Sequence, residues 1–141
     1  MALYESMGAG DGFALIKKMH GDSVHSYIAR QLSSGEERLL ILRDSCLPED
    51  FDEACRIGPY CFSASVLKWI EEQIRLAIAK GVTPIYLDEV GKLEMMNKGY
   101  DALFREVLEK ERDIYVTIRE DLIEAVVAHY HISSYTIITP D

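Results

Sequence analysis

Two adjacent acids follow a short apolar segment in the second half of the chain. Residues 85–87 are typical of a β-strand, and Asp88 and Glu89 come directly after them. Because side chains alternate in direction along a strand, the two carboxylates suit different tasks. In phosphoryl-transfer sites the first acid after such a strand holds Mg²⁺, and a neighbouring acid orients or deprotonates the attacking water. The pair therefore indicates phosphate chemistry, with a strand that simply ends in two solvated acids as the alternative.

The loop after these acids carries three further residues suited to such a site. Gly91 permits a tight turn, Lys92 supplies a cation for phosphate oxygens, and Glu94 adds a third acid. A second candidate cation, Arg119, directly follows another β-prone segment, residues 114–118. An acidic metal-dependent hydrolase of an unrelated kind is a further hypothesis that fits these residues.

Alternating helices and strands are expected to position these residues. The spacing of apolar residues predicts a helix between Ser63 and Gly81, whereas later helices and strands are expected around residues 85–87, 100–108, 114–118, 122–127 and 135–138. Such alternation favours an α/β fold with a mainly parallel sheet flanked by helices. Right-handed crossovers would bring the ends of its strands to one carboxyl edge, where ligands bind in open α/β sheets.

The first third of the chain has a different pattern. Two β-prone segments, residues 13–16 and 24–28, flank a turn at residues 20–23 and predict an N-terminal antiparallel hairpin. A third strand is expected at residues 38–42, and residues 44–62 are expected to be irregular because Pro48 and Pro59 interrupt them.

The length sets the expected domain organisation. With 141 residues the chain is predicted to form one domain over residues 13–141. Residues 1–12, which end in a cluster of glycines, are expected to be a linker or tail.

The acidic loop also supports a family resemblance. Residues 88–94 read Asp-Glu-Val-Gly-Lys-Leu-Glu, which resembles the Asp-Glu-Ile/Val-Gly-Lys-Met/Leu-Glu signature of the thermophilic nucleoside-triphosphatase family. Residues 56–60 resemble the Arg-x-Gly-x-Tyr segment of that family, and residues 117–118 and 139–140 match its later elements. The resemblance implies a P-loop NTPase-like fold with an extra hairpin, and Mg²⁺-dependent hydrolysis of nucleoside triphosphates.

The resemblance also implies roles for the candidate residues. Glu89 takes the catalytic, water-activating role and Asp88 the metal-binding role. Glu94 is the expected second metal ligand, and the expected nucleotide-binding residues are Lys92, Thr117 and Arg119.

One feature of that family is not found in this sequence. No Gly-x-x-x-x-Gly-Lys-Ser/Thr sequence, whose backbone amides and lysine hold the phosphates, occurs in the 141 residues. We therefore expect a nucleotide-binding protein that is incomplete or inactive alone, and a homo-oligomer or a partner chain that supplies the phosphate loop. A non-catalytic interaction or regulatory module on the same fold is the alternative.

Composition limits the partners. The 15 basic and 24 acidic residues give a net charge of −9, which disfavours nucleic acid and anionic membrane surfaces. The three cysteines are an odd number without metal-ligand spacing, which is typical of a reducing compartment, and we expect a cytoplasmic protein.

Overall fold

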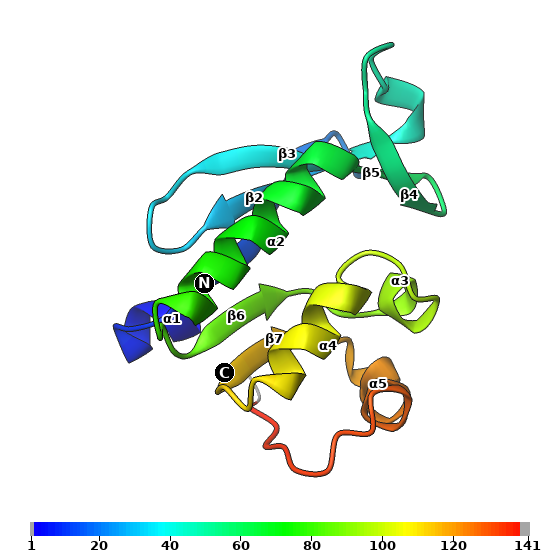
Figure 1. The fold of residues 1–141 in the computed structure, drawn as a ribbon. Helices are drawn as coiled ribbons and strands as arrows, with labels where there is room; N and C mark the ends of the chain where they lie inside the picture. Colours follow the sequence, from blue (N-terminus) through cyan, green and yellow to red (C-terminus); the bar gives the residue numbers. More distant parts are fainter. Residues whose placement is uncertain (1, 139–141) are drawn as a thin grey trace.

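The computed structural model describes residues 2–138, which form one seven-stranded sheet with helices packed against it (Figure 1). The strands are β1 (Asp11–His20), β2 (Ser23–Gln31), β3 (Glu37–Arg43), β4 (Glu53–Ile57), β5 (Tyr60–Ser63), β6 (Ile85–Asp88) and β7 (Ile114–Thr117). The α-helices are α1 (Ala2–Met7), α2 (Ala64–Ala79), α3 (Lys92–Met95), α4 (Asp101–Glu109) and α5 (Ile123–His129), and the 3₁₀ turns are η1 (Asp44–Cys46) and η2 (Glu120–Leu122).

The sheet has an antiparallel half and a parallel half. Its strand order is β4-β5-β3-β2-β1-β6-β7, and every pairing from β4 to β1 is antiparallel. The pairings of β1 with β6 and of β6 with β7 are parallel. The α/β fold is confirmed, but the expectation of a mainly parallel sheet needs correction, because the antiparallel part extends beyond a single hairpin to five strands.

The β1–β2 hairpin is confirmed and begins earlier than expected. His20 pairs with Ser23 across a two-residue turn, in which Gly21 has a φ of 64° that favours glycine. At its other end β1 starts at Asp11, which pairs with Ile85, so the sheet includes the end of the segment expected to be a linker.

The predicted irregular segment contains a second hairpin, which corrects the interpretation of residues 44–62. β4 and β5 pair across a turn made by Gly58 and Pro59, and β5 pairs with β3. Pro59 therefore lies in the turn and leaves the hydrogen bonding of the two strands intact. Burial alternates along β5, which is typical of a strand that packs on one face.

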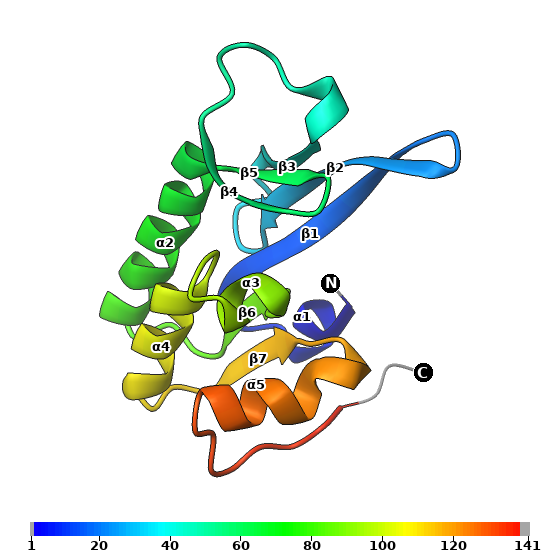
Figure 2. The same cartoon turned by 90° about the vertical axis from the view of Figure 1, so that its right-hand side faces the viewer.

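Helices lie on both faces of the sheet. Figures 1 and 2 show α2 and α4 on one face and α1 on the opposite face. The Ser63 side chain accepts a hydrogen bond from the Val66 N–H, so the predicted N-cap of α2 is confirmed. On the other face Tyr4 of α1 contacts the ring of Tyr86 edge-on, with 5.6 Å between the ring centroids.

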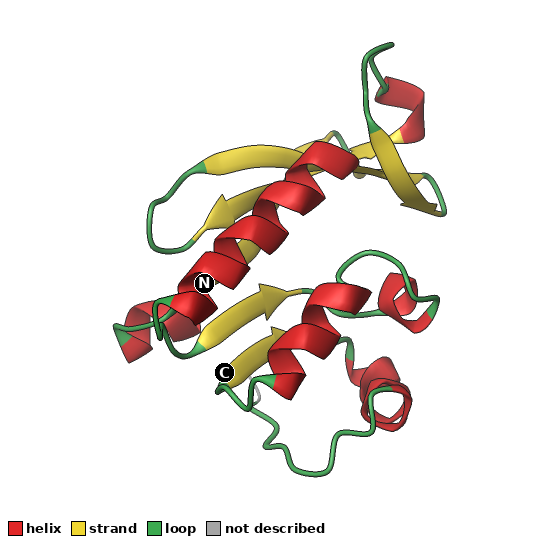
Figure 3. Cartoon of the chain, in the orientation of Figure 1, coloured by secondary structure: helices red, strands yellow, loops and turns green. Residues whose placement is uncertain are grey.

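The strand expected at residues 135–138 is wrong. The chain has no regular secondary structure after α5 as far as residue 138 (Figure 3). Tyr135, Ile137 and Ile138 have 56%, 61% and 56% of their surface exposed, so this apolar segment has the composition of a strand without a neighbouring strand.

None of the helices in residues 2–138 combines the length and the apolar character needed to cross a bilayer.

Candidate functional site

Asp88 lies where two parallel strands end, at the carboxyl edge of the sheet. It is the last residue of β6 and pairs with Thr117, the last residue of β7. The Thr117 hydroxyl donates a hydrogen bond to Asp88 Oδ1 at 2.5 Å, and the Leu15 N–H on β1 donates one to Oδ2 at 2.9 Å. Residues of β1, β6 and β7 thus fix the orientation of the carboxylate. The sequence predicted that the ends of β6 and β7 would meet at this edge.

Glu89 follows Asp88 and faces a different environment. Its side chain is exposed, and its Oε1 lies 3.9 Å from the point that a Cβ on Gly91 would occupy. Partial loss of hydration, followed by the charge of Asp88, raises the pKa of Glu89, and the nearby Arg119 opposes this rise. A raised pKa makes this carboxylate a stronger base once it is ionised, which suits activation of water.

The candidate cations lie beside these acids. Lys92, the first residue of α3, and Arg119, between β7 and η2, are both exposed and line the same cavity as Glu89. The Arg119 guanidinium also forms an exposed ion pair with Asp121 at 2.8 Å. Such a pair contributes little to stability, so it does not prevent Arg119 from contacting another anion.

Glu94 differs from the other predicted site residues. It is 4% exposed, and its two carboxylate oxygens accept hydrogen bonds from the Gly91 N–H at 2.7 Å and the Tyr100 N–H at 2.8 Å. Burial raises its pKa, and the two backbone bonds act against that rise. These contacts give the carboxylate a structural partner for each oxygen and hold the loop from Gly91 to Tyr100 in place.

The donor set at the edge is compatible with a divalent cation that arrives with its ligand. Among residues 2–138 there is no cluster of three or more His, Cys, Asp or Glu side chains placed to hold a metal. Mg²⁺ keeps several waters and takes one or two carboxylates together with substrate phosphates, so Asp88 and the Thr117 hydroxyl satisfy its protein contribution.

A cavity of about 410 Å³ opens beside Glu89. Its walls combine residues of the antiparallel strands with residues of the segment from Glu89 to Tyr100; the apolar and aromatic ones include Leu15, Tyr27, Ile57, Tyr60, Phe62 and Tyr100. Sequence reasoning did not predict this cavity, although it singled out several of its lining residues: Glu89, Lys92, Glu94 and Arg119 as candidate site residues, and Tyr60 in the segment at residues 56–60. The other wall residues look like ordinary core residues in the sequence.

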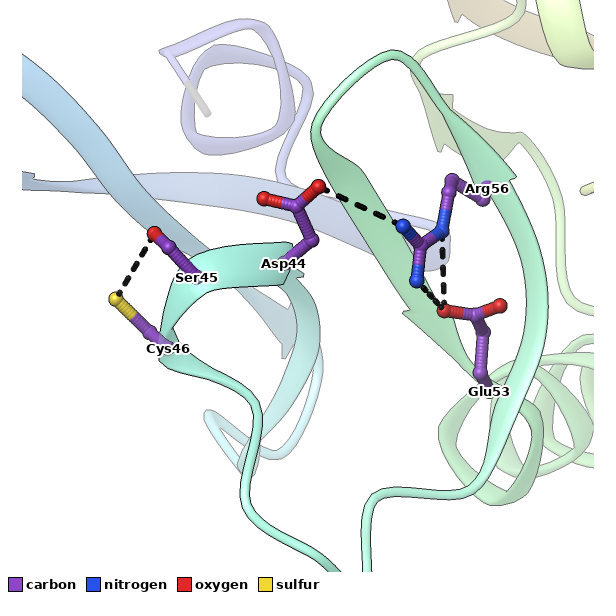
Figure 4. Close-up of polar contacts among 5 residues, drawn as sticks. All are labelled: Asp44, Ser45, Cys46, Glu53 and Arg56. Atoms are coloured by element: carbon purple, nitrogen blue, oxygen red, sulfur yellow. Dashed lines mark hydrogen bonds and ion pairs between the residues drawn. The ribbon is translucent and has the colours of Figure 1, made fainter.

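Arg56 forms exposed ion pairs beside the hairpin that carries part of this wall. Its guanidinium donates to Glu53 Oε1, with an Nη2 distance of 2.7 Å, and lies 3.5 Å from Asp44 Oδ2 (Figure 4). These contacts connect β4 with η1 at the surface.

Comparisons with known proteins bear on the family and the fold. A solution structure of a human cancer-related nucleoside triphosphatase matches with a TM-score of 0.55 and 22% sequence identity, covering 90% of this chain and 72% of that one. At this identity the match establishes a shared fold. No curated protein matches the chain. The profile of the NTPase family matches residues 8–139, nearly the whole chain, and the chain therefore belongs to the NTPase family.

Proposed function

We propose that the protein binds nucleoside triphosphates and is related to Mg²⁺-dependent NTP phosphohydrolases. The observation that carries the proposal is the pairing of Asp88 with Thr117 at the carboxyl edge, with Glu89, Lys92 and Arg119 around it. Family membership supports the same class of ligand. The human nucleoside triphosphatase of similar fold supports hydrolysis as the family's reaction.

Each site residue has a separate role in this proposal. Asp88 and Thr117 hold Mg²⁺, which would neutralise charge on the phosphates when bound. Glu89 orients the attacking water and accepts its proton, and Lys92 and Arg119 contact phosphate oxygens. We assign Glu94 a positioning role instead of the metal role expected for it, because its carboxylate is buried and bound to N–H groups of its own loop, whereas Asp88 is only partly buried at the end of its strand.

We further propose that this chain alone turns over little or no nucleotide. The 141 residues contain no Gly-x-x-x-x-Gly-Lys-Ser/Thr sequence to hold the β- and γ-phosphates. Positioning dominates phosphoryl transfer, and a misplacement of about 1 Å costs on the order of 100-fold in rate. A phosphate loop from outside these 141 residues would complete the site.

Calorimetric titration with ATP and Mg²⁺ tests this function. We expect weak binding that requires Mg²⁺, and at least a tenfold loss of affinity in Asp88→Asn, since one carboxylate charge on the metal is removed. Asp113→Asn is the matched control, because Asp113 is exposed and immediately precedes β7 at the opposite end of that strand. Equal binding by wild type and Asp88→Asn would favour two solvated acids without a ligand role.

A phosphate-release assay tests whether this chain alone hydrolyses nucleoside triphosphates. We expect release close to the background rate. Turnover of about 1 to 100 per second that is unchanged in Glu89→Gln would contradict both the requirement for a phosphate loop and the role of Glu89.

We also propose that the protein associates with a second chain, either another copy or a partner that brings the loop. Within residues 2–138, β7 has a paired strand on one side only, and Tyr135, Ile137 and Ile138 expose apolar surface. Unpaired strand edges and exposed apolar segments favour pairing with another chain. Light scattering after size exclusion would show self-association as about twice the mass of 16.0 kDa. A 16.0 kDa species at high micromolar concentration would exclude the homo-oligomer and leave the partner chain.

The protein's cysteines are consistent with action in the cytoplasm, where thiols stay reduced. Cys46, Cys55 and Cys61 are all free.

A further inference from the structure

The outer end of the β1–β2 hairpin brings two histidines together. His20 is the last residue of β1, and His25 lies near the start of β2. Their ring centroids are 6.4 Å apart, and the ring planes are tilted by 41° to each other. His20 is exposed and His25 is partly exposed, at a hairpin that extends past the other strands (Figure 2). The two imidazoles are therefore neighbours that solvent and its ions can reach.

The backbone of β2 departs from a regular ladder where these rings meet. Between the Lys18–Ser26 pair and the Met19–Val24 pair, β2 has one residue more than β1, and that residue is His25. An extra residue of this kind forms a β-bulge, and bulges are used in proteins to direct a particular side chain. The local geometry thus singles out the residue that faces the other histidine.

A hydrogen bond also fixes the ring of His25. Its Nδ1 lies 3.1 Å from Oγ of Ser26, a side chain that is only 3% exposed. In the tautomer in which Nδ1–H donates to this hydroxyl, Nε2 keeps its lone pair for another partner. Metal-binding histidines nearly always engage their second nitrogen in this way, which orients the ring and selects the tautomer. His25 is therefore arranged as a metal ligand is.

The separation of the rings suits one shared metal ion. A transition metal binds imidazole nitrogen at about 2.0–2.1 Å, which places the ion about 3.2 Å from the ring centroid. Two imidazoles on one ion consequently have centroids between about 5 Å and about 6.5 Å apart, depending on the angle between the bonds. The observed 6.4 Å lies in this range, and rotation of the exposed His20 side chain adjusts it.

The ligand type distinguishes this pair from the acids at the carboxyl edge. Imidazole suits Zn²⁺, Ni²⁺ and Cu²⁺, whereas carboxylate, carbonyl and water suit Mg²⁺. The positions also differ, because Leu15 is the residue of β1 that contacts Asp88 and His20 lies five residues further along the strand. At about 3.3 Å per residue this distance is about 16 Å. An ion at the hairpin is thus separate from one that binds with phosphates.

The charges around the pair have opposite effects. Lys17 and Lys18 on β1 are exposed and repel a cation, whereas the exposed Asp22 in the turn attracts one. Coordination through two nitrogens of one hairpin adds to the affinity, because the second bond forms within the molecule. We therefore expect a dissociation constant between micromolar and millimolar.

We infer that His20 and His25 form an open binding site for a divalent first-row transition-metal ion of the Zn²⁺, Ni²⁺ and Cu²⁺ class. The protein supplies the two imidazoles, and water fills the remaining positions on the ion. Ser26 is a positioning residue that holds the ring of His25. The inference is independent of the proposed nucleotide function, because no residue of that site takes part in it.

Zinc titration of the full chain tests the inference without nucleotide. We would follow the ring signals of all four histidines by NMR. The signals of His20 and His25 should shift together and saturate before those of His129 and His131. Mg²⁺ at the same concentration should shift neither ring of the hairpin. The thiol of Cys46 is exposed and also binds zinc, but an ion held there leaves the hairpin rings unchanged.

Three variants sharpen the test. His20→Ala should weaken zinc binding at His25 at least tenfold, because one of the two ligands is lost. Ser26→Ala should weaken it about tenfold, which is typical when a hydrogen-bond partner of a metal ligand is removed. His131→Ala is the matched control, since it removes an exposed histidine far along the chain, and should bind within twofold of wild type.

Three results would overturn the inference. The first is no saturable shift of either hairpin ring at millimolar Zn²⁺. The second is a shift of all four histidines with equal affinity, which would indicate unspecific binding. The third is an unchanged affinity of His25 in His20→Ala, which would mean that the two rings do not share an ion. None of these results depends on ATP binding, so the proposed function is tested separately.

Discussion

The open edge of the sheet and the buried loop next to it carry acids from one short sequence motif, yet the surroundings of these acids differ between the two regions. At the open edge Glu89 is exposed and lines a cavity, whereas in the buried loop Glu94 is 4% exposed and accepts two backbone hydrogen bonds. Four residues lie between them. A motif of this kind thus combines residues that meet ligands with residues that hold the loop in shape, and residue type alone does not distinguish the two.

Replacing each acid by alanine gives the largest contrast between the two regions. Glu94→Ala leaves the buried N–H groups of Gly91 and Tyr100 without acceptors, at about 1–3 kcal/mol each, so we expect a loss of about 3 kcal/mol in the free energy of unfolding. Glu89→Ala should change it by less than about 0.5 kcal/mol, as is usual for exposed residues. Urea denaturation of both variants measures the difference. Equal losses would show that the two acids do not differ in role.

Gly99 offers a smaller test of the buried loop. A Cβ at this position would lie close to Glu94 Oε2, where the available space is too small for it. The residue also has a φ of 60°, which disfavours other side chains. We expect Gly99→Ala to lower the melting temperature by more than Gly81→Ala does.

Gly81 is the matched control because it has a φ of 74° and nothing within 4 Å of its Cβ position. Its substitution costs the backbone term alone, about 1–2 kcal/mol. Equal effects of the two substitutions would mean that the Glu94 carboxylate moves without penalty and does not hold the loop.

Sequence reasoning predicted the strands that meet at the edge better than what surrounds them. The apolar strand before Asp88 and the segment before Arg119 have local patterns, and the parallel pairing of their strands follows from helix–strand alternation. The hydrogen bond from the Leu15 N–H to Asp88 has no such signal, because a backbone donor is available at almost every residue and only the register of β1 selects this one.

The errors in the predicted fold have physical causes. Pro59 seemed to exclude a strand, but it lies in the turn between β4 and β5, where no ladder hydrogen bond is needed. Residues 135–138 have the β-branched and aromatic composition of a strand, but propensity alone forms no strand without a neighbour to pair with. Glu94 is buried against Gly99 and accepts the Gly91 and Tyr100 N–H groups, contacts that no local pattern in the sequence indicates.

The smallest expected effect is a change in the pKa of Glu89 at the open edge when its charged neighbours are replaced. Partial desolvation and the charge of Asp88 raise this pKa, and Arg119 lowers it. Asp88→Asn should therefore lower the pKa of Glu89 and Arg119→Ala should raise it, as measured by the pH dependence of its side-chain carboxyl carbon in NMR. Shifts of the same sign in both variants would show that these neighbours do not set the charge state of Glu89.

The most direct test of the account locates the metal. Mn²⁺ added with ATP broadens NMR signals close to where it binds, and the account predicts that the amide signals of Leu15, Glu89 and Thr117 broaden first. In Asp88→Asn this broadening should disappear at the same Mn²⁺ concentration. Broadening centred on the exposed acids Glu120 and Asp121, and unchanged in Asp88→Asn, would contradict a metal–nucleotide site at the end of β6.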